Sequence, residues 1–469
     1  MPRQIAKTQL ASFLPRTSHA ELRAIGKGLR AKCPRRSHAA WKANGGRLDP
    51  LQLVRQANKG RIPELVPIRY DRMIHSPFTF YRGTALNMAA DLATTPSTGL
   101  CVQACGDAHL GNFRCFATPE RRVIFDIHDL DETLPAPWEW DVKRLAASFV
   151  IACRNNGLSD RVGRQAVLTC LRNYREQMAE FSRMTALNVW YTRVDAEALI
   201  GKLEGKQRRK QLRKTLTKAR ERSAYEHDFP KLAHRAAGLP AIKEHPPTIY
   251  HWRNHDRDCA IVRHSFQQYR NTLRYDRRGL LDRFQLHDLA IKVVGVGSVG
   301  TFCFVLLLMA EDEDPLFLQL KEARTSVLEA FAPASVFPNH GQRVVTGHRL
   351  MQSASDIFLG WTATKSGRNY YVRQLRDAKV KFDVDRFDSH HMRVFAECCG
   401  LTLARAHARS GEPAAISGYL GKSDVFDRAI ADFAVTYADQ AEGDYESFRK
   451  AVRSGKEKNP RISRRGLSL

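Results

Sequence analysis

The sequence predicts an α+β protein whose β-rich and helical stretches occupy different parts of the chain. Two short apolar segments between residues 98 and 132 each run into an acidic loop, and a glycine-rich turn after residue 286 is flanked by apolar segments. Residues 137–157 and 390–411 instead show the amphipathic spacing of helices. Because 469 residues are too many for one compact core, we expect two or three subdomains.

The composition is that of a folded protein without membrane segments. Apolar residues make up 43% of the chain and aromatic residues 9%, both of which are globular values. No apolar run approaches the length of about 18 residues that a membrane span needs, and the first residues lack the apolar centre of a secretory signal. Ten scattered cysteines without paired metal-ligand spacing predict a reduced, cytoplasmic protein with no membrane partner.

The chain carries a net charge of +26, and its basic residues gather in the first sixty residues, in the tail and in the run from Gly205 to Arg222. Such a field attracts phosphate groups of nucleotides or nucleic acids, and it favours an anionic substrate. Within the run, Leu212 and Leu216 recur at helical spacing, which favours a solvated helix face. Nucleic acid is the less favoured partner because the run contains no base-reading motif or stacking aromatic residue.

The stretch "CGDAHLGNFR" combines side chains suited to chemistry. Asp107 follows a predicted strand and could accept a proton from an attacking hydroxyl, while the carbonyl oxygen of Asn112 could bind a hard cation. The next strand carries Asp126 in "FDIHDLDE", where it could supply a carboxylate to the same Mg²⁺. Turn and capping roles for Asp107, Asn112, Asp129 and Asp131 are the structural alternative. Two successive strand-to-acid motifs favour a site.

The histidines of the same segment suggest a metal centre only weakly. His109 and His128 lack a third ligand at a spacing suited to zinc. We therefore expect His109 to hold the loop through a hydrogen bond.

A second cluster, "GVGSVG", spans Gly295, Gly297 and Gly300 and matches a motif shared by two folds. In a dinucleotide-binding protein the following apolar segment is a helix whose N-terminus binds the pyrophosphate of NAD, and Glu322 is the acid that closes the next strand. In a kinase-like lobe the glycines form a hairpin over the phosphates, and Lys321 lies on the following strand. The apolar segment has no polar stripe, so its periodicity does not decide between helix and strand.

The two clusters together favour a phosphotransferase. A lysine near a glycine turn and an Asp…Asn…Asp set are the groups that phosphoryl transfer from ATP with Mg²⁺ requires. A dinucleotide-binding fold would leave the cluster around Asp107 unexplained. An NAD(P)-binding protein and a non-catalytic nucleotide- or nucleic-acid-binding protein are the alternatives.

Several stretches also resemble a known family. "CGDAHLGNF", "FDIHDLDETLPAPWEWDVKRLAAS", "VVGVGSVGT", "LQLKEA", "QSASDIFLGWT", "YYVRQLRDAK" and "LARAHARSG" resemble the bacterial domain-of-unknown-function family 2252, from about residue 60 to 450. That family has no settled activity to carry over to this chain.

More distantly, "GDAHLGN" resembles the catalytic loop of aminoglycoside-phosphotransferase-like kinases. The resemblance implies that Asp107 is the catalytic base, Asn112 a magnesium ligand and His109 the loop histidine. Cys105 departs from the family pattern, which has a histidine at this place.

The segments that follow carry the same resemblance. "VIFDIHD" implies that Asp126 is the magnesium aspartate, with Asp129 as the alternative, and "WEWDVKRLA" implies that Asp141 braces the catalytic loop.

The order of these parts is reversed relative to an ordinary kinase, because the glycine turn and Lys321 follow the catalytic loop. We therefore predict a protein-kinase-like two-lobed fold that is circularly permuted and carries a helical insertion. This fold would bring Lys321 close to Asp126. Glu329 is the expected acidic partner of Lys321, and Glu322 is less favoured.

The prediction divides the chain into six segments: a basic, partly disordered leader (1–60), a large-lobe-like core with the catalytic loop (61–159), a basic helical region (160–285), an ATP-lobe-like β-rich region (286–380), a helical region that completes the large lobe (381–449) and a basic tail (450–469).

Overall fold

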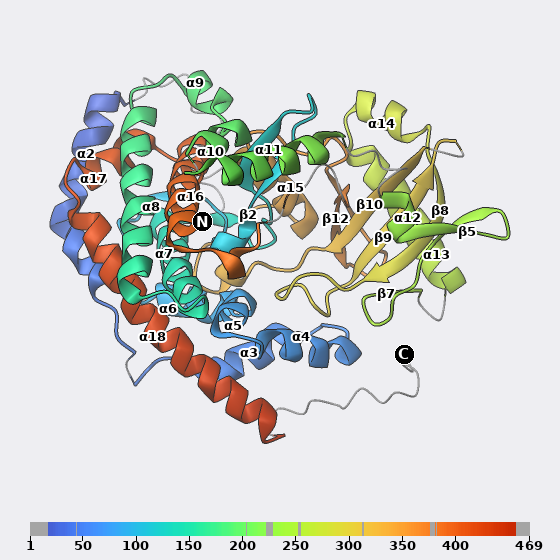
Figure 1. The fold of residues 1–469 in the computed structure, drawn as a ribbon, viewed down its shortest axis with the longest axis horizontal. Helices are drawn as coiled ribbons and strands as arrows, with labels where there is room; N and C mark the ends of the chain where they lie inside the picture. Colours follow the sequence, from blue (N-terminus) through green and yellow to red (C-terminus); the bar gives the residue numbers. More distant parts are fainter. Residues whose placement is uncertain are drawn as a thin grey trace.

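The structure is a computed structural model that describes residues 17–455 apart from 44, 203, 222–227, 252–254, 312–313, 376–379 and 381. A helical half and a half built on an antiparallel sheet lie side by side (Figure 1). The prediction of an α+β fold is thus confirmed. The first sixteen residues of the predicted leader and residues 456–469 of the predicted tail lie outside the described residues. No helix in the described ranges has the length and apolarity needed to cross a bilayer.

The large sheet has six strands in the order β11-β12-β10-β9-β8-β7, and every neighbouring pair is antiparallel. Its strands are β7 (Ile249–Tyr250), β8 (Gln285–Lys292), β9 (Cys303–Met309), β10 (Pro315–Glu322), β11 (Gly360–Ala363) and β12 (Asn369–Gln374). Every residue of β9 and β10 is buried, because both faces of the sheet are covered. The apolar segment after the glycine turn therefore lacks a polar stripe although it is a strand, and it is not the helix of the dinucleotide alternative.

Different elements pack on the two faces of the sheet. Leu306 and Leu308 of β9 pack in one cluster with Tyr269 and Leu281 of the helices α13 (His255–Thr272) and α14 (Tyr275–Leu281). The intervening Leu307 packs on the other face against residues of α12 (Phe229–Leu232) and of the hairpin β5 (Ala233–Ala236) and β6 (Leu239–Ile242). The predicted helical region 160–285 thus also contains strands: β5 and β6 form an extra layer on the sheet, and β7 is an edge strand of the sheet itself.

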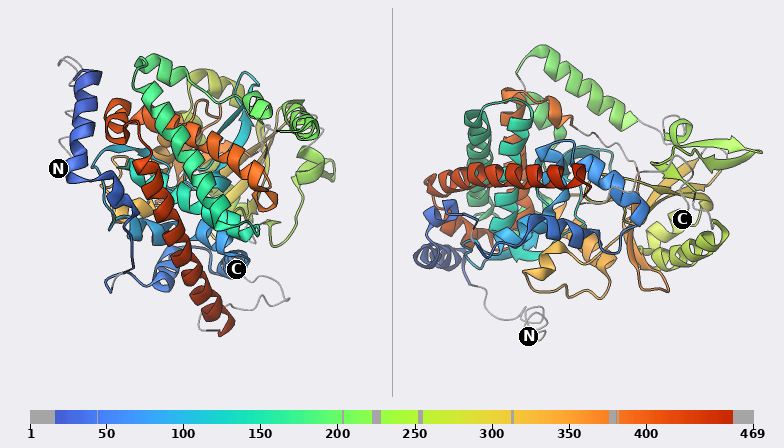
Figure 2. Two further views of the ribbon diagram at one scale, coloured as in Figure 1. Left: turned by 60° about the vertical axis from the view of Figure 1, so that its left-hand side comes forward. Right: turned by 90° about the horizontal axis from the view of Figure 1, so that it is seen from below.

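The helical half is built around α7 (Trp138–Asn155), in which every residue from Trp138 to Cys153 is buried. It is surrounded by α8 (Asp160–Phe181), α16 (Ser389–Ser410) and the long α18 (Val425–Arg453), which crosses this half of the molecule (Figure 2). The other helices are α2 (His19–Lys32), α3 (Pro50–Asn58), α4 (Val66–Met73), α5 (Pro77–Gly83), α6 (Ala85–Leu92), α9 (Ala186–Tyr191), α10 (Ala196–Lys202), α11 (Lys206–Glu221), α15 (His340–Met351) and α17 (Pro413–Leu420).

The described part of the leader is more ordered than the sequence suggested. Helix α2 packs on α17 so closely that a Cβ at Gly26 would lie 1.9 Å from the carbonyl oxygen of Ala415. Arg30 donates hydrogen bonds to the carbonyl oxygens of Gly418 (2.6 Å) and Tyr419 (2.9 Å). The basic residues of this segment therefore fasten it to the helical half.

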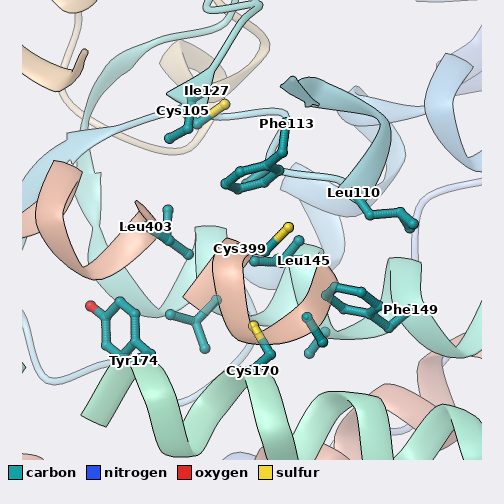
Figure 3. Close-up of a cluster of buried hydrophobic side chains, with 14 of the residues drawn as sticks. Cys105, Leu110, Phe113, Ile127, Leu145, Phe149, Cys170, Tyr174, Cys399 and Leu403 are labelled. Atoms are coloured by element: carbon teal, nitrogen blue, oxygen red, sulfur yellow. The ribbon is translucent and has the colours of Figure 1, made fainter. Parts of the chain in front are cut away.

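Two small two-stranded antiparallel sheets carry the acidic loops between the halves. They pair β1 (Cys101–Ala104) with β4 (Leu134–Pro137), and β2 (Phe113–Ala117) with β3 (Val123–Ile127). Apolar side chains at and after the first loop pack over the central helices (Figure 3). Cys105, Leu110 and Phe113 lie on one side, and Leu145 and Phe149 of α7 and Cys399 and Leu403 of α16 lie on the other. The loop that follows β1 thus rests on a packed core.

A buried ion pair ties β3 to α16. Arg405 donates a hydrogen bond of 2.5 Å to Asp126 Oδ1, and neither side chain is exposed. Asp126 Oδ2 accepts hydrogen bonds from the backbone N–H (2.9 Å) and hydroxyl (2.8 Å) of Ser353, which follows α15. The carboxylate thus joins three segments that are distant in sequence.

We predict that Arg405→Met strongly destabilises the fold, because it leaves the charge of Asp126 buried without its partner. The free energy of unfolding should fall by about 3–5 kcal/mol, measured by urea denaturation. Arg428→Met is the matched control, since Arg428 forms an exposed pair with Asp424 on α18, and it should leave the urea midpoint unchanged. Equal midpoints for the two variants would contradict a structural role for the buried pair.

Candidate active site

A cavity of about 580 Å³ lies where the two halves meet. The helical half contributes the loop after β1 and the loop after β3, and the sheet half contributes the glycine turn between β8 and β9. Of the residues predicted from the sequence, the cavity is lined by Asp107, His109, Asn112, Asp129, Gly295, Gly297 and Glu329.

The loop after β1 is held by Asp141, in the first turn of α7. Its carboxylate accepts hydrogen bonds from the backbone N–H groups of Cys105 (2.6 Å) and Gly106 (2.9 Å), and His407 Nε2 lies 3.2 Å away. Gly106 has φ +78°, and a Cβ there would come within 2.5 Å of the carbonyl oxygen of Glu132. Only glycine fits this position, and Asp141 makes the contacts that the resemblance implied.

Cys105 is a buried packing residue. Burial, followed by the charge of Asp141, raises the pKa of its thiol well above the ordinary value, so the side chain is neutral. Its Sγ lies 3.7 Å from the carbonyl oxygen of Asp129. Cys105, which stands where the kinase pattern has a histidine, therefore adds no charge to the loop.

Asp107 is oriented by an arginine from α7. Arg144 donates from Nε to Asp107 Oδ1 (2.7 Å), and its NH2 group lies 2.5 Å from the same oxygen. Burial raises the pKa of Asp107, and the attraction of Arg144 opposes but does not cancel that effect. A base with a raised pKa that presents one carboxylate oxygen to a cavity is suited to accepting a proton.

His109 is a neutral residue that packs beneath the loop. Burial, followed by the charges of Arg82 and Arg144, lowers the pKa of its imidazole well below the ordinary value. Its Nε2 lies 3.7 Å from Asp107 Oδ2, too far for a hydrogen bond, and its Nδ1 is buried without a partner among the described residues. The predicted loop-holding hydrogen bond from His109 was therefore wrong, and the ring supports the loop by packing against Gly111. The ranges described contain no group of three His, Cys, Asp or Glu side chains placed to hold a metal ion.

Asn112 and Asp129 are the residues that could hold a magnesium ion. Asn112 Nδ2 donates to the carbonyl oxygens of Asp107 (2.9 Å) and Asp129 (3.4 Å), which leaves Oδ1 as a ligand. Mg²⁺ is commonly held by one or two protein oxygens together with phosphate oxygens and water, so this donor set fits it.

The structure corrects the choice of aspartate. Asp126 lies inside β3, where it is fully buried against Arg405, and it does not line the cavity. Asp129 lies beyond the end of the strand, where the chain turns into the cavity. The alternative that the sequence left open is therefore the better placed residue.

Lys321 lies on β10 against the acidic loop of the helical half. Its Nζ contacts a carboxylate oxygen of Asp131 and lies 3.3 Å from both carboxylate oxygens of Asp129. Burial lowers the pKa of Lys321, but these two carboxylates outweigh it and raise the pKa well above the ordinary value. In Asp129 the attraction of Lys321 likewise outweighs burial, and the pKa lies well below the ordinary value.

The acidic partner predicted for Lys321 was wrong. Glu329 caps a short 3₁₀ helix (Val327–Ala330) through Ser326, and Glu322 pairs with Arg368 at 3.0 Å. Asp129 and Asp131 lie beside Lys321 only because the fold brings the two halves together. The local sequence therefore did not identify them as its partners, apart from the density of acidic residues in "HDLDE".

The glycine turn is fastened to the N-terminal helices. Gly295 and Gly297 line the cavity, whereas Gly300 turns away and its carbonyl oxygen accepts a hydrogen bond of 2.7 Å from Ile62 N–H. The carbonyl oxygen of Gly295 accepts one of 2.5 Å from Arg72. Val296 is buried in a cluster with residues of α4, α5 and α18.

Three arginines of the site escaped the sequence analysis. Arg144 lies one helical turn after Asp141, and this spacing could have placed both on one face of the helix. Arg82 and Arg114 line the cavity beside the loop, and no sequence pattern marks them.

Comparison with known proteins identifies the family of the chain. The family model described as "Uncharacterized protein conserved in bacteria (DUF2252)" matches residues 61–451, which include the cavity-lining loops, the glycine turn and Lys321. No curated protein and no solved structure matches the chain. The chain therefore belongs to the DUF2252 family of bacterial proteins.

Proposed function

We propose that this protein is an ATP- and Mg²⁺-dependent phosphotransferase that acts on a hydroxyl group. The observation that carries the proposal is the meeting of Asp107, Asn112 and Asp129 from one half with the glycine turn from the other around one cavity. Lys321 does not line this cavity, but it is buried directly behind it, in contact with the lining carboxylates of Asp129 and Asp131. These are the types of group that phosphoryl transfer requires, because its catalysis rests on positioning and on neutralising charge.

The local connections support a kinase-like arrangement. The glycine turn joins two antiparallel strands, β8 and β9, and Lys321 lies on the third strand, β10, as the phosphate-binding lysine does in protein kinases. Asp107 and Asn112 have the spacing of the catalytic-loop aspartate and asparagine of kinases, and Asp129 follows the next hairpin. Helix α15, which follows β10, carries no glutamate, and this departs from the kinase pattern.

The contacts between the halves also support a circular permutation. Lys321 and Asp129 lie 192 residues apart in the chain, yet their charged groups are in contact. The predicted neighbour, Asp126, is three residues from Asp129 in sequence, but it is buried against Arg405 and does not line the cavity. We propose that the catalytic-loop half comes first and the nucleotide half second.

The residues would share the reaction as follows. Asn112 and Asp129 would hold Mg²⁺, which supplies charge neutralisation for the phosphates of bound ATP. Asp107 would accept the proton of the acceptor hydroxyl while that oxygen forms its bond to the γ-phosphorus and the bond to the β,γ-bridging oxygen breaks, releasing ADP. Arg144 would hold Asp107 Oδ1 so that Oδ2 meets the acceptor.

The alternatives receive less support. The segment after the glycine turn is a strand, so it offers no helix N-terminus for the pyrophosphate of NAD(P). The basic run forms α11, which buries Leu216. It exposes Arg213, Lys214 and Lys218, as expected for a helix whose charged face is solvated. A non-catalytic nucleotide-binding protein would use the same cavity without turnover.

We predict that Lys321→Met and Asp129→Asn each weaken binding of Mg²⁺·ATP at least tenfold, because each removes a charge that would contact phosphate or metal. Isothermal titration calorimetry measures the affinity. Lys365→Met is the matched control, since Lys365 is exposed in the turn between β11 and β12. Unchanged binding in both site variants would exclude this cavity as the nucleotide site.

Asp107→Asn should separate binding from turnover. We expect the affinity for Mg²⁺·ATP to stay within about twofold, whereas release of ADP falls by about 10²–10⁴-fold because the base is lost. A coupled assay of ADP formation measures turnover, with water replacing the acceptor. Full turnover in this variant would show that Asp107 is not the base.

A further inference from the structure

Two arginines stand on the cavity wall beside Asp107. Arg82 ends α5 and Arg114 lies on β2, and both line the cavity. The Nε atom of each is buried without a hydrogen-bond partner. Arg82 Nε lies 3.6 Å from the position that a Cβ at Gly111 would take, so this guanidinium group stands against the catalytic loop.

The other cations of the site already have partners. Arg144 pairs with Asp107, and Lys321 pairs with Asp129 and Asp131. Arg61, Arg69 and Arg324, which also line the cavity, donate to the backbone carbonyl oxygens of Val299, Gly83 and Lys59, respectively. Within the described part of the chain, Arg82 and Arg114 differ from all of these in forming neither an ion pair nor a hydrogen bond through their guanidinium groups.

A bound anion would give Arg82 and Arg114 a partner for their charge and their N–H donors. Burial lowers the pKa of both guanidinium groups by more than the nearby carboxylates raise it, chiefly Asp107 for Arg82 and Asp129 for Arg114. Asp107 and Asp129 act on these cations from a distance, but no carboxylate in the described residues forms an ion pair with either, so their N–H donors are open to a ligand. A phosphate dianion matches both their charge and their fork of N–H donors. A carboxylate would match only one of the two charges.

We propose that the acceptor is a small phosphomonoester with a free hydroxyl, whose phosphate is bound by Arg82 and Arg114 while its hydroxyl meets Asp107. This inference rests on the proposed phosphotransferase activity. The position of both arginines beside the catalytic loop assigns them to the acceptor. The cavity volume of about 580 Å³ is in the range of small-molecule sites.

The test is calorimetric titration of inorganic phosphate into the full chain at constant ionic strength, with and without a saturating non-hydrolysable Mg²⁺·ATP analogue. We expect phosphate to bind in both cases, and Arg82→Gln and Arg114→Gln each to weaken it at least tenfold. Arg324→Gln is the matched control, because this arginine lines the cavity but is bonded to backbone, and it should bind phosphate like the wild type. Arg82→Lys, which keeps the charge but loses the fork, should show an intermediate loss.

Three results would overturn the proposal. The first is no phosphate binding by the wild type, and the second is acetate binding more tightly than phosphate. The third is that the nucleotide analogue displaces phosphate and that the arginine variants lose affinity for phosphate and for the analogue equally. The last result would assign the arginines to the nucleotide. Arginine-dependent phosphate binding without any binding of Mg²⁺·ATP would support the anion site but refute the phosphotransferase, so the two proposals fail separately. Thermal melting of each variant confirms that it is folded.

Discussion

The site depends first on the carboxylate of Asp141. Two buried backbone N–H groups, those of Cys105 and Gly106, would lack acceptors at the end of β1 if this side chain were absent. Their bonds to Asp141 fix the path of the loop, and the loop in turn places Asp107 and Asn112 at the cavity. The acceptor sits on α7, the most deeply buried helix, so the geometry of the loop is set by the rigid core of the helical half.

The second constraint is the charge shared between the halves. Lys321 is a buried cation of the sheet half, and its counter-charges, Asp129 and Asp131, belong to the helical half. While the halves are packed together, loss of either carboxylate would leave the buried lysine under-compensated, which is costly in a low-dielectric interior. The ion pairs between Lys321 and the two aspartates therefore fix the position of one half relative to the other. The same lysine would have to share its contacts when an anionic ligand enters the cavity.

The sequence predicted what depends on short spacing. Asp107 and Asn112 lie together because a strand end and five residues of loop determine their positions, and the glycine motif indicated a turn with a lysine strand to follow. The choice between Asp126 and Asp129 depends instead on where β3 ends and which face it buries, which one sequence does not reveal. The partners of Lys321, and the roles of Arg82 and Arg114, arise only when distant segments pack. Gly300 belongs to the motif, yet its neighbours in space turn it away from the cavity.

The manner in which the glycine turn is fastened bears on how the cavity could close. In a flexible phosphate-covering loop the backbone is free to move over its ligand. Here Val296 is buried against α4, α5 and α18, while Arg72 and Ile62 bond the carbonyl oxygens of Gly295 and Gly300. All of these partners belong to the N-terminal helices or to the helical half. Because Ile62 and Val299 also pack in the apolar cluster of the sheet, the turn is fastened to both halves, and closing it over a ligand would disturb both sets of contacts. In the proposed permuted order, residues 61–83 thus give the glycine turn a rigidity that its sequence does not predict.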